Sequence, residues 1–335
     1  MSSLTIENEA WILDKSIELG FLECKAIPLI DDPNYEAYEE WVIKGHHEPL
    51  KYLNKNLDKR KNPANLGKSL KTAIVFLHPY PKSFSSEYIA KYALGKDYHY
   101  FIKEKLKNLS SLFQHEIKTL VEEKFCVDSV PILERSLAQR SGLGWVGKNG
   151  CLISRKHGSF FLISVWLISL EIENYTEPQP FFHCGKCTRC IDACPTDAFL
   201  TPGFLDTHKC LSTQTIENRK QIPFEFYKKI DTYAFGCDIC QDVCPWNRKH
   251  NNFINDDKLP DVITLLKLTE PEFRAYFKDT ALMRPGWAGL KRNLLIFAAN
   301  TTHAPKELFL NYKEHDNTLI RETSIQILKE YFDIH

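Results

Sequence analysis

The sequence predicts a chain in three parts: an α/β domain over residues 1–178, a cysteine-rich domain over residues 179–255 and an α-helical unit over residues 256–335. Its 335 residues exceed the usual size of a single domain. Helical and strand-like patterns alternate in the first part, and eight of the eleven cysteines lie in the second. Apolar residues have helical spacing in the third. These observations define the three parts.

The composition excludes several classes of protein. Lys and Arg number 43, as do Asp and Glu, so the formal net charge is zero and the chain is neither a basic nucleic-acid coat nor an acidic tail. Hydrophobic residues make up 43%, which is enough to bury a core and excludes a mainly disordered state. Binding to a polyanion would need a local patch. Residues 44–71, with eight basic and two acidic side chains, are one candidate.

The first part alternates helix and strand. Residues 4–25 have the apolar spacing of a helix. Thr72–Leu77 is a β-branched and apolar run, which predicts a buried strand. Residues 86–124 predict long helices. Phe160–Leu170 is too short an apolar run to span a membrane and predicts a second buried strand.

Two interpretations are open for Asp128, which precedes a helix predicted to continue through Arg140. Pro131 suits a first helical turn, so that Asp128 or Ser129 could cap the helix. In an apolar cleft the same carboxyl would keep its proton and act as a general acid. Glu134 is predicted to form a surface ion pair on this helix.

Gly142–Gly147 matches the dinucleotide pattern G-x-G-x-x-G in the wrong context. That fingerprint follows a strand and opens a helix, whereas here a helix precedes it and a strand follows. We therefore expect no nicotinamide site. The glycines predict a tight turn, or backbone lying flat against a planar ligand.

The central cysteines have the spacing of a two-cluster, bacterial ferredoxin-like domain. In such a run three thiolates bind one 4Fe–4S cluster and the fourth binds its neighbour. The first run is Cys184-x2-Cys187-x2-Cys190-x3-Cys194-Pro195, and the second, Cys237-x2-Cys240-x3-Cys244-Pro245, lacks a first member that Cys210 can supply. The predicted ligands are Cys184, Cys187, Cys190 and Cys244 for the first cluster, and Cys194, Cys210, Cys237 and Cys240 for the second.

Structural zinc also uses paired C-x2-C knuckles and is the alternative. Three evenly spaced cysteines and the Cys-Pro that closes both runs favour iron–sulfur. Two adjacent clusters imply one-electron transfer to another site.

Cys24, Cys126 and Cys151 are expected to be buried apolar residues. The N-terminus carries no secretory pattern, so we expect a cytoplasmic monomer without a membrane anchor.

Several motifs together resemble the epoxyqueuosine reductase family, over about residues 70–250. They are Asp97-Tyr98-His99, Asp128-x2-Pro131-x2-Glu134-Arg135, Gly142-Leu-Gly-Trp-Val-Gly-Lys-Asn149, Cys194-Pro-Thr, Cys210-Leu-Ser-Thr-Gln-Thr-Ile-Glu217 and Gly236-Cys-Asp-Ile-Cys-Gln-Asp-Val-Cys-Pro-Trp-Asn247. The resemblance implies an oxidoreductase that removes the epoxide oxygen of epoxyqueuosine at the tRNA wobble position and leaves queuosine.

The resemblance also implies the cofactors and the role of each part. A low-potential donor would pass electrons through two 4Fe–4S clusters to cobalamin, and Asp128 would protonate the departing oxygen. The α/β domain would bind cobalamin, and a HEAT-like C-terminal unit would help to hold the tRNA. Asp97-Tyr98-His99 begins like the cobalamin-ligating motif D-x-H-x-x-G, but Ile102 replaces the glycine, so we expect no histidine ligand to cobalt.

Contacts to cobalamin and tRNA are predicted at polar and basic residues. Because electron transfer needs cobalamin close to a cluster, the candidates for cobalamin are Tyr98, His99, Asp128, Lys148, Ser154, Ser212, Gln214, Thr215 and Asp238. The candidates for tRNA phosphates are Arg284, Lys291 and Arg292, together with residues 44–71. Intramolecular hydrogen bonds and solvated helix faces are the alternatives.

Two other functions stay open. Related cobalamin and two-cluster modules would suit a reductive dehalogenase-like enzyme that acts on a small organohalide. In a non-enzymatic electron carrier or corrinoid-handling protein, Asp128 would only cap a helix.

Overall fold

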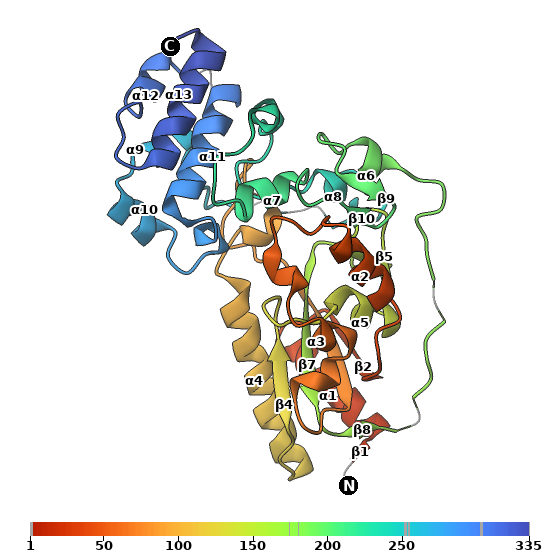
Figure 1. Cartoon of the computed structure of the whole chain (residues 1–335). Coiled ribbons are helices and arrows are strands. Elements are labelled where there is room, and N and C mark those ends of the chain that lie inside the picture. The colour runs from red at the N-terminus through yellow and green to blue at the C-terminus, as the bar shows by residue number, and fades with distance from the viewer. Residues whose placement is uncertain are drawn as a thin grey trace.

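The computed structural model describes residues 3–173, 175–179, 181–250, 253, 255–301 and 304–334. Figure 1 shows a body of strands and helices near the N-terminus, a group of short helices above it, and a bundle of helices that carries the C-terminus. No helix in the described part of the chain is long and apolar enough to cross a membrane.

The first part is built on a four-stranded sheet in the order β2-β3-β7-β4, in which all neighbouring strands are antiparallel. The strands are β2 (Glu23–Pro28), β3 (Thr72–Pro79), β4 (Glu123–Cys126) and β7 (Phe161–Ile168). β3 and β7 lie in the middle and are largely buried, which confirms the two strands predicted from apolar runs.

Alternation along β3 sends its side chains into two cores. Ile74 and Phe76 pack beneath α1 (Ile6–Glu18) and α4 (Tyr98–Ile117), whereas Val75 and Leu77 pack beneath α5 (Glu134–Arg140). Helices therefore cover both faces of the sheet, as predicted, but its strands are antiparallel rather than parallel as in a typical α/β domain.

Only part of residues 86–124 is helical, so that prediction is partly wrong. The segment before α4 contains a single short turn, η3 (Lys91–Ala93). Its backbone bonds to distant segments instead: the amide of Ala90 donates to the carbonyl of Phe235, and that of Asp97 donates to the carbonyl of Asp279. These partners lie outside the first part, and helical propensity alone could not reveal them.

The cysteine-rich part consists of short elements. They are α6 (Arg189–Asp192), β9 (Phe199–Thr201), β10 (Phe204–Leu205), α7 (Leu211–Ile216), η4 (Phe224–Lys229), α8 (Ile239–Asp242) and η5 (Pro245–Asn247). The glycine motif forms a turn into the hairpin of β5 (Trp145–Val146) and β6 (Leu152–Ile153), with Gly142 at φ +79°. This confirms the tight-turn interpretation of that motif.

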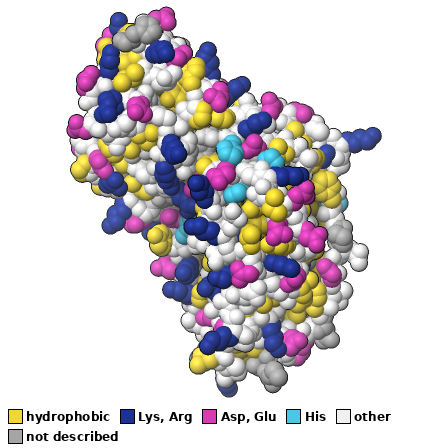
Figure 2. All heavy atoms as spheres, in the orientation of Figure 1, with side chains coloured by type: hydrophobic (Ala, Val, Ile, Leu, Met, Phe, Trp, Pro, Cys, Tyr) yellow, Lys and Arg dark blue, Asp and Glu magenta, His cyan; other side chains and the backbone are white. Residues whose placement is uncertain are grey.

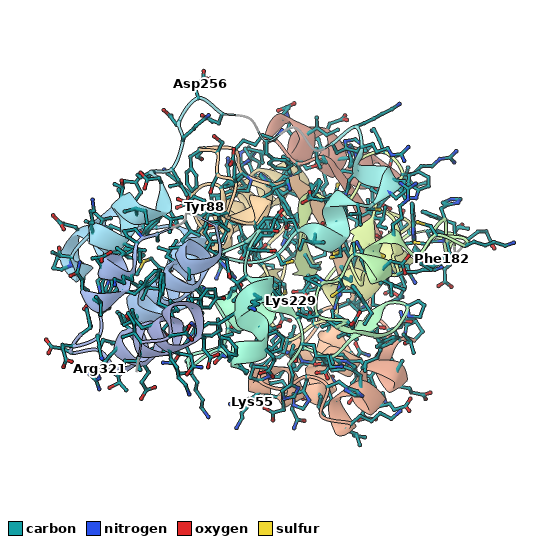
Figure 3. The ribbon with its side chains drawn as sticks, turned by 90° about the horizontal axis from the view of Figure 1, so that it is seen from above. Lys55, Tyr88, Phe182, Lys229, Asp256 and Arg321 are labelled. Atoms are coloured by element: carbon teal, nitrogen blue, oxygen red, sulfur yellow. The ribbon has the colours of Figure 1, made fainter. Side chains whose placement is uncertain are left out.

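The C-terminal part is helical, as predicted. It comprises α9 (Val262–Lys267), α10 (Glu270–Tyr276), η6 (Ala281–Met283), α11 (Gly286–Thr301), α12 (Lys306–Leu310) and α13 (Thr318–Phe332). α11 packs against α13, α9 and α7, so the helical core extends into the cysteine-rich part. Tyr88 joins it from the first part by packing on Phe297, and Figure 3 shows Tyr88 beside these helices.

The remaining elements are peripheral to the sheet. They are β1 (Ser3–Leu4), which pairs with β8 (Glu171–Ile172), then α2 (Tyr35–Ile43), η1 (Lys51–Asn54), α3 (Leu57–Lys61) and η2 (Pro63–Leu66). The indole of Trp41 on α2 donates to the carbonyl of Leu205, so α2 is attached to the cysteine-rich part.

Candidate active site

A cavity of about 840 Å³ lies where the three parts of the chain meet. The α/β part contributes Tyr98, His99 and Asp128, the cysteine-rich part Ser212, and the segment before α11 contributes Arg284. Aromatic side chains also line the cavity, namely those of Tyr52, Tyr80 and Tyr92. The cavity therefore combines polar groups with apolar surface, which is typical of a site for a large ligand.

Asp128 occupies a strained turn at the edge of this cavity. It lies two residues beyond β4, has φ +58° and keeps 55% of its side chain exposed. α5 begins only at Glu134, with Leu133 as its N-terminal cap residue. The helix-cap interpretation of Asp128 is therefore wrong, because its carboxylate faces the cavity.

Two residues hold the Asp128 carboxylate, and a third, Asp97, orients one of them. The Tyr98 hydroxyl donates to Oδ2 at 2.9 Å, and His99 Nε2 lies 3.2 Å from the same oxygen. Asp97 Oδ1 contacts His99 Nδ1 at 2.7 Å and also accepts the His99 backbone amide, as the N-cap of α4. Both ring nitrogens of His99 are thus engaged, and its ring stacks on Tyr98.

Electrostatics place the proton on His99 in this open site. Burial disfavours the charged ring, but hydrogen bonds to Asp128 and Asp97 outweigh it and raise the pKa of His99 to about 9. Burial likewise favours a neutral Asp128, but hydrogen bonds from His99 and Tyr98 and the charges of His99 and Arg284 lower its pKa. At neutral pH the two residues form an ion pair.

Glu134 provides a second carboxyl near Asp128. Its Oε1 is buried without a hydrogen-bond partner, so the predicted surface ion pair is not formed. Burial raises the pKa of Glu134 to about 8, and the charge of Asp128 adds to the rise. Glu134 is therefore largely protonated at neutral pH.

The structure gathers the eight central cysteines into two groups. Charge interactions link Cys190 with Cys184 and Cys244, and link Cys244 with Cys187. In the same way Cys237 interacts with Cys210 and Cys194, and Cys240 interacts with Cys237 and Cys210. The two sets predicted from spacing are here called the first quartet (Cys184, Cys187, Cys190, Cys244) and the second quartet (Cys194, Cys210, Cys237, Cys240). Because Cys244 also interacts with Cys151, which in turn interacts with Cys240, this assignment stays a prediction.

Within the described residues, no three His, Cys, Asp or Glu side chains are placed to hold one metal ion. A four-iron cluster spreads its four thiolates over four metals. Cys24 and Cys126 are buried, as predicted, whereas Cys151 is half-buried and accepts a hydrogen bond from Cys240 of the second quartet.

Only some of the predicted cobalamin contacts reach the cavity. Tyr98, His99, Asp128 and Ser212 line it. The other five have partners within the chain: Lys148 bonds to the Gly185 carbonyl, Ser154 to the Lys156 amide, Gln214 to the His208 carbonyl, Thr215 to the Leu211 carbonyl and Asp238 to the Lys91 amide. The intramolecular alternative therefore describes these five better.

The structure corrects two of the three predicted tRNA contacts. Arg292 is fully buried and donates to the carbonyls of Asn218, Lys220 and Gln214, where it holds the segment after α7. Lys291 is buried and donates to the Leu268 carbonyl. Neither is available to a phosphate. Arg284 is exposed at the cavity, where its Nε lies 2.8 Å from Oε1 of Glu217.

Sequence reasoning missed part of this site. It did not predict Glu217 as the partner of Arg284 or Tyr92 and Tyr52 as cavity wall, because these positions are distant in sequence and no local pattern links them. The motif Asp97-Tyr98-His99 is recognisable in the sequence. Its two contacts with Asp128 are not, because Tyr98 and His99 lie 30 and 29 residues away from that aspartate.

Comparisons with known proteins agree with this architecture. Residues 183–247 match a model of the 4Fe-4S double cluster binding domain, and residues 60–129 match the model "Epoxyqueuosine reductase QueG, DUF1730". The chain is 38% identical to an epoxyqueuosine reductase of Cyclobacterium marinum, over 87% of this chain and 97% of that protein. It is 41% identical to one of Leadbetterella byssophila, over 88% and 98%.

Solved structures show the same fold. The structure of epoxyqueuosine reductase from Streptococcus thermophilus matches with a TM-score of 0.86 and 29% identity, over 98% of this chain and 92% of that one. An epoxyqueuosine reductase with an epoxyqueuosine-modified tRNA stem loop shares the fold with a TM-score of 0.83 at 24% identity, over 96% and 89%. The resemblance seen in the motifs is confirmed: this chain belongs to the epoxyqueuosine reductase family.

Proposed function

We propose that this chain reduces epoxyqueuosine in tRNA to queuosine, and that the Asp128–His99 pair supplies the proton to the leaving oxygen. Family membership supports the reaction and makes the chain an oxidoreductase. The observation that carries the proposed site is the chain of contacts from Asp97 through His99 to Asp128, which ends in a cavity beside the second quartet.

The reaction defines what the protein must provide. Conversion of an epoxide to an alkene consumes two electrons and two protons, and the oxygen leaves as water. No side chain is a strong enough reductant, so a cofactor is needed. Cobalamin, when bound, supplies this reducing power, and the iron–sulfur clusters supply its electrons.

The protein side chains manage the proton. In the open site the proton lies on His99 Nε2, against Asp128 Oδ2. Asp97 accepts from Nδ1 and holds the ring in one orientation. When ligands fill the cavity and exclude water, a charged Asp128 becomes less favourable. The proton then moves to Asp128 Oδ2, which donates it to the departing oxygen.

The cavity lining fits cobalamin as the large ligand. Tyr98, His99, Asp128 and Ser212 would hold it from two parts of the chain, and Ser212 lies two residues beyond Cys210 of the second quartet. His99 would not ligate cobalt, because both of its ring nitrogens already have carboxylate partners.

Exposed basic residues near the cavity would contact tRNA phosphates. Figure 2 shows Lys and Arg side chains gathered along the junction between the C-terminal lobe and the α/β body. Arg219 and Arg284 interact electrostatically with each other, and Arg284 with Tyr52 of η1. η1 belongs to the basic segment 44–71, whose Lys51 and Lys55 are exposed. These cations would position the anticodon loop while the modified base enters the cavity.

The other two functions considered from sequence are set aside. A small-molecule dehalogenase and a non-enzymatic carrier both conflict with the assignment to the epoxyqueuosine reductase family. The double-cluster domain match likewise sets aside the zinc alternative.

Mass spectrometry of tRNA nucleosides tests the proposal. Anaerobically prepared protein, loaded with its clusters and cobalamin, is incubated with a strong reductant and tRNA that carries epoxyqueuosine. We expect conversion to a nucleoside lighter by one oxygen, and none without cobalamin. Unchanged epoxyqueuosine with intact clusters and bound cobalamin would refute the proposed reaction.

A further inference from the structure

The surroundings of the first quartet are open to solvent. Beside Cys184, Phe182 keeps 54% of its surface exposed, and Figure 3 shows it at the outer edge of the molecule. His183, Lys186 and Arg189 are also exposed, in the same loop and the start of α6. An exposed phenyl ring is thus surrounded by polar and positively charged groups within a few residues of three predicted cluster ligands.

Positive charge dominates this region. Lys148 reaches it from the glycine motif and donates to the Gly185 carbonyl at 2.8 Å. Arg248 and Lys249, which follow Cys244, are exposed as well. The nearby acid, Asp192, accepts a hydrogen bond from the Thr188 hydroxyl. The surface around the first quartet therefore favours a negatively charged partner.

The second quartet has the opposite surroundings. Thr213 and Thr215 on α7 and Asp238, which follows Cys237, are buried, although Lys209 next to Cys210 is exposed. Ser212, beside Cys210, lines the cavity. A partner protein could approach the first quartet directly, whereas the second quartet is the one whose sequence neighbour Ser212 lines the candidate active site.

We propose that the surface formed by Phe182, His183, Lys186 and Arg189 docks a small acidic electron-carrier protein. The inference rests on the proposed function, which requires an external electron donor. Each encounter would oxidise the carrier by one electron and reduce the first cluster by one electron, so two encounters serve one epoxide. Opposite charges accelerate such transient encounters, and an exposed aromatic ring suits the centre of a small interface.

Stopped-flow absorbance with the cluster-loaded full chain tests this surface. The probe is an acidic protein with a single FMN, reduced to its hydroquinone, which becomes a semiquinone as it gives up one electron. Lys186→Glu combined with Arg189→Glu should slow cluster reduction by this probe by about tenfold and weaken its dependence on ionic strength. Reduction by a photochemically generated, uncharged small reductant should keep its normal rate.

A matched variant distinguishes docking from general charge. Lys107 on α4 and Lys124 on β4 are exposed and lie far from α6 in Figure 1. Lys107→Glu combined with Lys124→Glu makes the same change in net charge and should leave reduction by the probe unchanged. Equal slowing by both pairs, or no slowing by the first pair, would overturn the proposal.

Two controls distinguish loss of docking from damage to the first cluster. Iron content and cluster spectra confirm that each variant is loaded, and Lys186→Gln combined with Arg189→Gln should give an intermediate slowing. Slowing by the uncharged reductant too would show damage to the cluster and would count against docking. Cluster reduction is measured before tRNA is added. The docking proposal can therefore be refuted while the proposed reduction of epoxyqueuosine still holds, and the proposed reduction can be refuted while docking still holds.

Discussion

The two cysteine quartets share a spacing but differ in their surroundings. The first lies among exposed side chains such as Phe182, Lys186 and Arg189, whereas the second lies against buried threonines and a cavity. Equivalent ligand patterns can therefore serve different steps. We therefore expect electrons to enter at the first quartet and to leave from the second toward the candidate active site.

Hydrogen bonds to sulfur also distinguish the quartets. In the first, the fully buried indole of Trp145 donates to Cys184 Sγ at 3.4 Å. In the second, the backbone amide of Ala198 donates to Cys194 Sγ at 3.4 Å. Such bonds stabilise the reduced, more negative state of a cluster. Trp145 would help the outer cluster to hold one electron until the second arrives.

The largest effect is expected from the cysteines themselves, because their substitution tests which quartet each belongs to. Cys187→Ser and Cys244→Ser should both remove the first cluster, although Cys244 is the last cysteine of the second run in sequence. Cys240→Ser should remove the second. Iron analysis and EPR should find about half of the wild-type iron in each variant, since one of two equal clusters is lost. If Cys244→Ser and Cys240→Ser lose the same cluster, the assignment is wrong.

The Asp128→Asn variant distinguishes proton donation in the cavity from electron transfer through the clusters. The amide has no carboxyl proton to donate, so queuosine formation should fall by about a hundredfold or more. Cluster reduction, followed by absorbance before tRNA is added, should be unchanged and serves as the internal control. Normal turnover by the variant would eliminate Asp128 as the proton donor.

The pH dependence tests the role of His99. Because the pKa of His99 is raised to about 9, the pair holds a transferable proton below that pH and loses it as the pH rises through about 9. Wild-type turnover should therefore decline near pH 9. His99→Gln keeps a donor to Asp128 but has no proton to pass on.

In His99→Gln, turnover should fall by about tenfold, the size expected for loss of one charge-assisted bond. Its decline should move to lower pH, because the remaining acid is Asp128 alone. The Tyr98→Phe variant is a useful comparison, since it removes the other hydrogen bond to Asp128 and leaves His99 in place. An unchanged pH profile in His99→Gln would show that the proton comes from elsewhere.

The last prediction concerns Trp145→Phe, which keeps a ring but removes the N–H donor and should leave the second cluster and the cavity unchanged. Loss of the bond to Cys184 should make reduction of the first cluster about tenfold less favourable, or about 59 mV lower for one electron. Redox titration followed by EPR measures this shift. Trp246→Phe is the control, because Trp246 contacts Trp145 edge-on and interacts with Cys244 through its backbone amide. Equal shifts in both variants would attribute the effect to packing.

Local features of this protein were predictable from sequence. The strands β3 and β7, the turn of the glycine motif and the cysteine groups depend on neighbouring residues and fixed spacings. The family itself was recognisable from motifs.

Long-range packing was not predictable in the same way. Lys291 and Arg292 look like exposed basic residues, but α11 is enclosed by other elements, so both side chains serve as internal donors. The backbone of Asp128 adopts a left-handed conformation rather than capping α5, because the chain must turn from β4 toward the cavity. No local pattern encodes such placements.

The most direct test of electron flow from the quartets to the epoxide is a single-turnover experiment. The cobalamin-loaded protein is reduced anaerobically, freed of reductant, and mixed with tRNA that carries epoxyqueuosine. Cluster absorbance and queuosine are then measured over time. We predict that the clusters reoxidise as queuosine forms, with two electrons lost per queuosine. Queuosine formation without cluster oxidation, or cluster oxidation without queuosine, would contradict this account.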